Sequence, residues 1–189
     1  IDHIYLLRED GSSLDLTPWE NAKSDFVSWA RDNISFFFLS NKRDAKFMDL
    51  YEMDIQNYTP KLIYQNNEGY DVGAISDNKK YLALSKSITT SNNELYIYNL
   101  ESQKLNHISA HEGDAKFLAQ FFDMENKHLF YLSNDKSEFQ YMVKLNIETG
   151  SKERVWDTNW DVWYGYNSYN EKYRVIGVNE DAKTIIHVV

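Results

Sequence analysis

One short apolar segment recurs along this chain at nearly constant spacing, and that recurrence restricts the fold more than any other feature. Residues 37–40 (FFLS) are repeated as residues 82–85 (LALS) and 130–133 (FYLS), with a weaker copy at residues 175–178 (VIGV). The copies begin 45, 48 and 45 residues apart. A period of this length, with several short strands in each unit, is typical of the blades of a β-propeller.

A second strand recurs in step with the first. Residues 49–54 (DLYEMD) match residues 94–99 (ELYIYN), and residues 140–146 (QYMVKLN) are a looser copy. Two strands that repeat together favour a propeller over the alternative, an all-β sandwich whose strands resemble one another by chance.

The clearest unit predicts a β-hairpin. We expect its strands at residues 34–40 and 48–55, joined by a polar turn at residues 41–45. The first of these strands is apolar on both faces, because residues 36–39 are consecutive apolar side chains. Such a strand needs cover from both sides, which copies of the same unit would supply.

The predicted fold is therefore all-β, an arc of about four propeller blades, each a four-stranded antiparallel sheet. We expect turns between the first two strands of successive blades at Asn33, Asn78, Asn126 and Asn170, because asparagine suits tight turns. The expected parts are the outer strands of a preceding blade, three blades and an incomplete blade, at residues 1–21, 22–68, 69–112, 113–158 and 159–189.

Both ends of the chain fall inside a predicted blade, so we expect a piece of a larger propeller. Propellers close by pairing the last blade with the first. A four-bladed ring, in which the N-terminal strands complete the last blade, is the alternative. In an open arc, the end blades would expose apolar faces and free strand edges, so self-association through these ends is expected.

Composition excludes several classes of function. The net charge of −9 argues against nucleic acid and anionic membranes as partners. The chain has no cysteine, which excludes disulfides, thiolate catalysis and zinc–thiolate sites. No apolar run approaches membrane-spanning length and no signal peptide is visible. The residues leave both the bacterial cytoplasm and the periplasm open as compartments.

Several segments resemble the propeller blades of the prolyl oligopeptidase family of serine peptidases, above all its bacterial acylaminoacyl- and dipeptidyl-peptidase-like members. They include SNKRDAKFMDLYEMDI, SNDKSEFQYMVKLNIETG and WDVWYGYNSYNEKYRVIGVNEDAKT. The propeller of the periplasmic protein TolB is similar too, and is the second choice. The resemblance covers essentially the whole chain and leans towards a periplasmic location.

The resemblance implies a non-catalytic cap over an α/β-hydrolase domain, which would be the partner, with peptides as substrates. Catalysis in that family uses a serine in a Gly-x-Ser-x-Gly turn. No two of the seven glycines here flank a serine at that spacing. The chain alone is therefore expected to be no enzyme, although its parent would be a serine peptidase; the alternative is a TolB-like protein-interaction module.

Other candidate sites are few. The segment from His111 to Asp114 is the one cluster with metal-like composition, but we expect a solvated loop, and no metal or cofactor is predicted. Glu180 and Asp181 are expected to form a turn rather than an acid–base pair.

Aromatic residues gather near the C-terminus, and Trp160, Trp163 and Tyr164 are the candidate interface residues among them. One interpretation is packing between blades; the other is an aromatic rim that contacts peptide or the hydrolase domain. The turn around Glu138 resembles a recurrent turn of these peptidases, which implies that this carboxylate could face the amine of a peptide.

Overall fold

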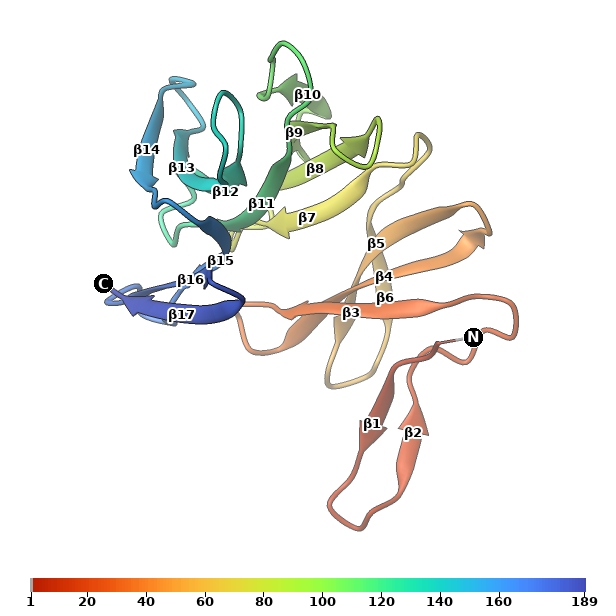
Figure 1. Cartoon of the computed structure of the whole chain (residues 1–189). Coiled ribbons are helices and arrows are strands. Elements are labelled where there is room, and N and C mark those ends of the chain that lie inside the picture. Colours follow the sequence, from red (N-terminus) through yellow and green to blue (C-terminus); the bar gives the residue numbers. More distant parts are fainter. Residues whose placement is uncertain (1) are drawn as a thin grey trace. The chain divides into compact units, whose positions relative to one another are not determined.

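The computed structural model describes residues 2–189, and this part of the chain consists of strands and connections without a helix. All pairings between its strands are antiparallel, so the all-β prediction is confirmed (Figure 1). Within residues 2–189 there is no helix long and apolar enough to cross a membrane. The chain forms two compact units, residues 1–69 and 70–189, each described by itself.

The first unit contains a hairpin and a four-stranded sheet. Strands β1 (Tyr5–Leu7) and β2 (Ser13–Asp15) pair with each other. The sheet follows chain order, with β3 (Ser24–Trp29), β4 (Ser35–Asp44), β5 (Phe47–Asp54) and β6 (Pro60–Tyr64). Phe36, Phe38 and Met53 of the sheet form a core with Leu16 and the partly buried Leu6 and Leu14. The hairpin thus covers one face of the sheet, and its assignment to a preceding blade stays a prediction.

The predicted turn at residues 41–45 is wrong. Strand β4 continues to Asp44, and the turn is confined to residues 45–46. The backbone stays extended here, and Arg43 reaches the completely buried Asp49, with Nε 2.7 Å from Oδ2. Arg43 was interpreted as part of a turn, but it pairs with a charge inside the fold.

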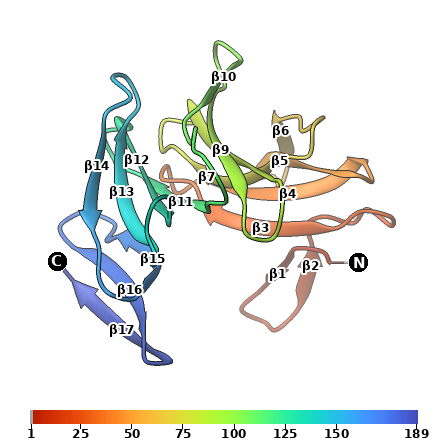
Figure 2. The same ribbon diagram turned by 45° about the horizontal axis from the view of Figure 1, so that its top comes forward.

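The second unit contains three sheets (Figures 1 and 2). Two have four strands and the third has three. Their strands are β7 (Asp71–Ile75), β8 (Tyr81–Ser87), β9 (Asn93–Asn99) and β10 (Lys104–His107); β11 (Phe117–Phe122), β12 (His128–Ser133), β13 (Tyr141–Asn146) and β14 (Lys152–Trp156); and β15 (Asp161–Asn167), β16 (Arg174–Glu180) and β17 (Lys183–Val188).

The second strand of a sheet is covered on both faces by neighbouring sheets, as its composition predicts. Leu129 and Tyr131 of β12 pack into a core shared with the sheet β7–β10. Phe130 and Leu132, on the opposite face of the same strand, pack against the sheet β15–β17. All four are 3% exposed or less, which explains why alternation of polar and apolar residues is absent from this strand.

Every first strand carries an irregularity that the sequence did not reveal. The pairing register shifts at one residue in each of β3, β7, β11 and β15, at Val27, Gly73, Gln120 and Trp163. At Gly73 a Cβ atom would lie 2.9 Å from the Cβ of Ala119, so only glycine allows this approach of β7 to β11. The amide oxygen of Gln120 accepts a hydrogen bond of 3.0 Å from the backbone N–H of Gly165 in β15. Within the second unit, the bulged residues therefore join the first strands of neighbouring sheets, β7 to β11 and β11 to β15.

Turns between first and second strands fall close to the predicted asparagines. The left-handed residue, with φ between 54° and 59°, is Asn33, Lys79, Asn126 or Glu171. It is the predicted residue in two turns and the next residue in the other two. In the latter, the side chains of Asn78 and Asn170 instead accept hydrogen bonds from the backbone N–H two residues on. Asp181 and Ala182 both have positive φ and form the turn between β16 and β17, so the predicted turn is correct for Asp181 and wrong for Glu180, which is the last residue of β16.

Candidate functional site

The connections at the two ends of the strands of sheet β11–β14 differ, and each end is called an edge below. The tight-turn edge holds the turns from β11 to β12 and from β13 to β14. The long-loop edge holds the longer connections 134–140, between β12 and β13, and 157–160, which leads to β15. Two adjoining cavities open at this second edge, of about 190 Å³ and about 490 Å³, and both are lined by Arg154.

Arg154 is held where the two cavities meet. Its guanidinium carbon lies 3.6 Å from the centre of the Tyr141 ring, a cation–π contact. Its Nη1 atom is 3.3 Å from Oδ2 of Asp157, and both side chains are about half exposed. A cation positioned by an aromatic face and a partly screened carboxylate remains available to a ligand.

Glu138 lies in the larger cavity, together with Phe139, Asp157 and Asn159. It is exposed and has no ion pair among residues 2–189. Trp160 lies close by, since its ring centre is 6.4 Å from that of Phe139, and it is 39% exposed. The structure thus brings two of the four candidate residues, Glu138 and Trp160, to one place.

The other two candidates lie on β15 and differ from each other. Trp163 is the bulged residue of the strand and is 53% exposed. Tyr164 is half-buried, and a Cβ atom at Gly177 would lie 2.3 Å from its ring, so the ring covers the backbone of β16. Tyr164 therefore packs on a strand of its own sheet rather than between blades, whereas Trp163 is exposed. The aromatic rim that contacts peptide or a hydrolase domain stays a prediction.

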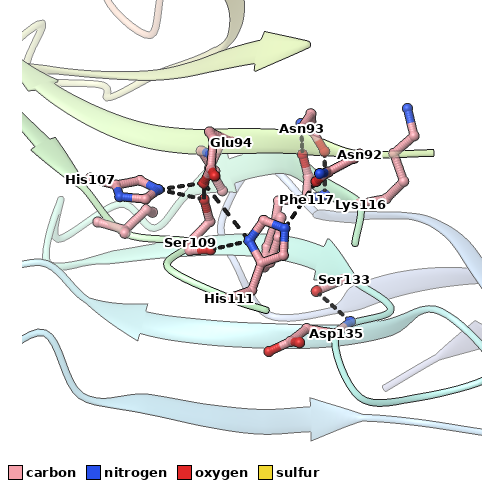
Figure 3. A network of polar contacts seen from close by, with 12 residues as sticks. Asn92, Asn93, Glu94, His107, Ser109, His111, Lys116, Phe117, Ser133 and Asp135 are labelled. Atoms are coloured by element: carbon pink, nitrogen blue, oxygen red, sulfur yellow. Dashed lines mark hydrogen bonds and ion pairs between the residues drawn. The ribbon is translucent and has the colours of Figure 1, made fainter. Parts of the chain in front are cut away.

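A polar network fastens the connection between β10 and β11 (Figure 3). Ser109 is buried; its hydroxyl donates to Glu94 Oε2 at 2.7 Å and accepts from the backbone N–H of Leu95 at 2.7 Å. His107 also binds Glu94. Burial acts to raise the pKa of Glu94, but the hydrogen bonds from Ser109 and His107 outweigh it and hold this pKa below its ordinary value.

The expected solvated loop at residues 111–114 is correct for Glu112, Gly113 and Asp114, which are exposed, and wrong for His111. The His111 side chain is 3% exposed; its Nδ1 is 2.7 Å from the Ser109 carbonyl oxygen and its Nε2 is 2.9 Å from Asn92 Oδ1. His111 therefore stabilises the connection. Within residues 2–189 no group of three or more potential ligands is placed to hold a metal ion.

Asn93 joins the sheet β7–β10 to the next sheet. Its side chain makes two hydrogen bonds of 2.8 Å with the backbone of Phe117, one to the N–H and one to the carbonyl oxygen. Asn93 is 4% exposed, so this pairing, drawn with dashed lines in Figure 3, is shielded from water. The long-loop edge is consequently anchored at its base.

Neither Arg154 nor Asn93 was singled out from the sequence. One signal was available for Arg154. Lys152 and Arg154 are two residues apart on a predicted outer strand, so both basic side chains lie on the same face. No comparable signal exists for Asn93, whose partner is the backbone of a distant strand.

The arrangement of repeated antiparallel sheets is matched by a protein family. The family model for the prolyl oligopeptidase N-terminal β-propeller domain matches residues 3–189. The chain belongs to this family. The resemblance seen in the sequence is thereby confirmed, whereas no curated protein sequence matches the chain.

Solved structures of proteins with different names share this fold. TolB from Acinetobacter baumannii is 15% identical with a TM-score of 0.67, and the match covers 98% of this chain and 48% of TolB. Prolyl oligopeptidase B from Galerina marginata is 16% identical with a TM-score of 0.61, covering 95% of this chain and 27% of the enzyme. An oligogalacturonate lyase is 12% identical with a TM-score of 0.60, covering 99% and 59%.

The chain thus spans about half of TolB and about a quarter of the oligopeptidase. At these identities the likeness establishes the fold alone, and function has to be argued from the site. As a prolyl oligopeptidase-family propeller domain, the chain corresponds to a part that accompanies a catalytic domain in prolyl oligopeptidases. The lack of a Gly-x-Ser-x-Gly turn in its sequence is consistent with a non-catalytic chain.

Proposed function

We propose that this chain is a non-catalytic cap that restricts the access of peptide substrates to an α/β-hydrolase domain of the same parent protein. Membership of the prolyl oligopeptidase N-terminal propeller family carries the proposal. A cap of this kind works by exclusion. It admits short unfolded peptides, keeps folded proteins from the nucleophile, and reduces the access of water once it is closed over the site.

The first test concerns activity. The purified chain should not hydrolyse peptide p-nitroanilides or esters, because its sequence lacks the nucleophile turn and any thiol. Turnover that is lost on mutation of a serine in this chain would overturn the proposal.

The second test concerns selectivity. In a protein that carries this chain with its hydrolase domain, a short peptide should be cleaved and a folded protein that contains the same cleavable segment should be spared. Loosening the cap, by disrupting the Asn93–Phe117 pairing with Asn93→Ala, should increase cleavage of the folded protein more than that of the peptide. Equal effects on both substrates would argue against an exclusion role.

Within this function, Glu138 is proposed to bind the protonated amine of a peptide. Its carboxylate lines the larger cavity with Asp157 and Arg154, whose opposite charges pair with each other, so one net negative charge remains there and suits a cation. In the protein with its hydrolase domain, Glu138→Gln should raise KM for peptides with a free amine and leave N-acetylated peptides unaffected. The matched control is Glu148→Gln, an exposed carboxylate in the turn between β13 and β14.

The second candidate function is a protein-interaction module like TolB. The specific observation in its favour is the exposure of aromatic side chains on β15 and the following turn, with Trp163, Tyr166 and Tyr169 more than half exposed. Tryptophan and tyrosine are enriched among residues that dominate protein–protein binding. If Trp163→Ala weakened capture of a defined protein partner and left peptidase selectivity unchanged, this candidate would replace the cap.

A further inference from the structure

The smaller cavity, beside Tyr131, has no role in the cap proposed above. It encloses about 190 Å³, and its apolar lining includes Phe117 and Val143 from the core of the sheets β7–β10 and β11–β14. This volume lies below the roughly 300–1,000 Å³ of pockets for drug-sized ligands. A ligand must therefore be small or be the end of a longer chain. The polar lining comes from Tyr131, Ser133, Asp135, Tyr141, Lys152 and Arg154.

Tyr131 is an unpartnered polar side chain in this cavity. It is 3% exposed, and its ring packs against Phe117 with ring centres 6.2 Å apart. Among residues 2–189 its hydroxyl makes no hydrogen bond, and it is not one of the fully buried atoms without a partner, so the oxygen faces the open space of the cavity. Burial raises the pKa of Tyr131, so the phenol stays neutral and can donate a proton to an acceptor.

Its polar neighbours offer further donors. Ser133 is 1% exposed and its hydroxyl oxygen accepts from the Asp135 N–H at 3.0 Å, which leaves its own proton for another acceptor. Tyr141 already donates to the Asp135 carbonyl oxygen at 2.9 Å. Lys152 donates one proton to the Ile108 carbonyl oxygen at 2.7 Å and retains two.

The charges of the lining select the kind of acceptor. Lys152 and Arg154 contribute two positive charges and Asp135 one negative charge, so the cavity is cationic by one unit. A single negative charge is balanced there, whereas a dianion would be repelled by Asp135. Arginine and hydroxyl groups together match the two oxygens of a carboxylate.

We propose that the cavity beside Tyr131 binds the carboxylate group of a small ligand, with hydrogen bonds from Tyr131 and Ser133 and charge balance from Lys152 and Arg154. The carboxylate can belong to a free organic acid, or to the C-terminus of a short peptide that continues past Arg154 into the larger cavity. The inference does not depend on the cap function, since it concerns binding by this chain alone.

The experiment is a titration of the ¹⁵N-labelled chain followed by NMR. The probes are acetate, N-acetylglycylglycine, the C-terminal amide of that peptide and inorganic phosphate. Acetate and the free peptide should shift the amide signals of Ser133 and Asp135, and the peptide amide should not. If the free peptide binds with higher affinity than acetate, the ligand is the C-terminus of a peptide. If the two affinities are equal, the ligand is a free organic acid.

Two variants test the named contacts. Tyr131→Phe should weaken carboxylate binding about tenfold, as expected for a hydrogen bond to a charged group. This variant should stay folded, because the hydroxyl has no partner to lose. Its control is Tyr5→Phe, which removes the same group from an exposed residue of β1. Lys152→Met should also weaken binding, and Lys104→Met, at the equivalent start of β10, should not.

Three outcomes would overturn the proposal. One is that no carboxylate shifts these signals in the folded wild-type chain. Another is that phosphate binds as tightly as acetate, which would contradict selection by Asp135. The third is that Tyr131→Phe binds as tightly as the wild type, because the Tyr131 hydroxyl would then have no part in binding.

Discussion

At one edge of the sheets β7–β10 and β11–β14 the connections are nearly identical, and at the other edge they differ in length and content. The turn from third to fourth strand begins with Asn99 in one sheet and Asn146 in the other. Each amide oxygen accepts from the backbone N–H groups two and three residues on, and the left-handed residue follows at Gln103 or Gly150. Asp54 does the same in the first unit.

The opposite edge obeys no such rule. It holds residues 88–92 and 108–116 in one sheet and 134–140 and 157–160 in the next, and it carries the polar network of Glu94 and both cavities around Arg154. The difference indicates that the tight-turn edge serves folding, since the side chain that begins each turn accepts hydrogen bonds from the backbone N–H groups of that turn. The long-loop edge is free to vary and can carry binding groups, as loops on a rigid scaffold usually do.

The largest expected effect is at Asn93, at the base of the long-loop edge. It would show that this edge, although its loops vary, also contributes to stability. Asn93→Ala should lower the free energy of unfolding by about 3 kcal/mol, because it leaves the buried N–H and carbonyl of Phe117 without partners. Urea denaturation measures it, with the exposed Asn106→Ala as control. A loss no larger than that of the control would mean that water replaces the asparagine and that the edge is not anchored there.

A slightly smaller effect is expected at the tight-turn edge. Asp123 accepts from the backbone of Lys127 and His128 and binds the His128 ring, so Asp123→Ala should lower the free energy of unfolding by about 2 kcal/mol. Asp135→Ala, at the other edge, should change it by less than about 0.5 kcal/mol. Equal losses at the two carboxylates would remove the distinction between the edges.

The contribution of Asp123 should also depend on pH. Burial acts to raise the pKa of Asp123, but the hydrogen bonds with His128 and Lys127 outweigh it and lower this pKa below its ordinary value of 3.8. The folded state therefore gains stability from the ionised carboxylate above this pH and loses it as the pH falls further. The difference in stability between the wild type and Asp123→Asn should accordingly shrink below about pH 4.

The polar network at the long-loop edge should contribute less. Glu94→Gln removes a charged acceptor from Ser109 and His107, and we expect a loss of about 1 kcal/mol in the free energy of unfolding. Glu112→Gln, an exposed carboxylate in the same connection, is the control. Hydrogen exchange at the backbone N–H of Leu95, which donates to Ser109, should quicken in the first variant alone.

The smallest effect comes from exchanging equivalent turn residues. Gln103 and Gly150 occupy the same place in successive turns, with φ of 56° and 72°. Glycine adopts this conformation without strain, so Gln103→Gly should stabilise the chain by about 0.5 kcal/mol, and Gly150→Gln should destabilise it by a similar amount. Changes of the same sign in thermal unfolding of both variants would contradict the equivalence of the two turns.

The sequence alone determined the sheets, their order and the chemistry of the tight turns. These features depend on residues that are near one another in the sequence or repeat regularly along it. They are the pattern of apolar residues within a strand, the asparagine whose amide oxygen accepts a hydrogen bond from the N–H two residues later, and a strand repeated every 45 to 48 residues. The extent of β4 was mispredicted for the same reason, because Arg43 pairs with a carboxylate that local pattern cannot show to be buried.

Only the tertiary structure decided the candidate sites. Glu138 and Trp160 were named from the sequence, but their proximity depends on Phe139 and on how β14 leads into β15. The cavity beside Tyr131 is lined by residues from 110 to 154, drawn from four strands and two loops of unequal length. Their meeting follows from strand register and from packing between sheets, which fix distances between residues that the chain itself keeps far apart.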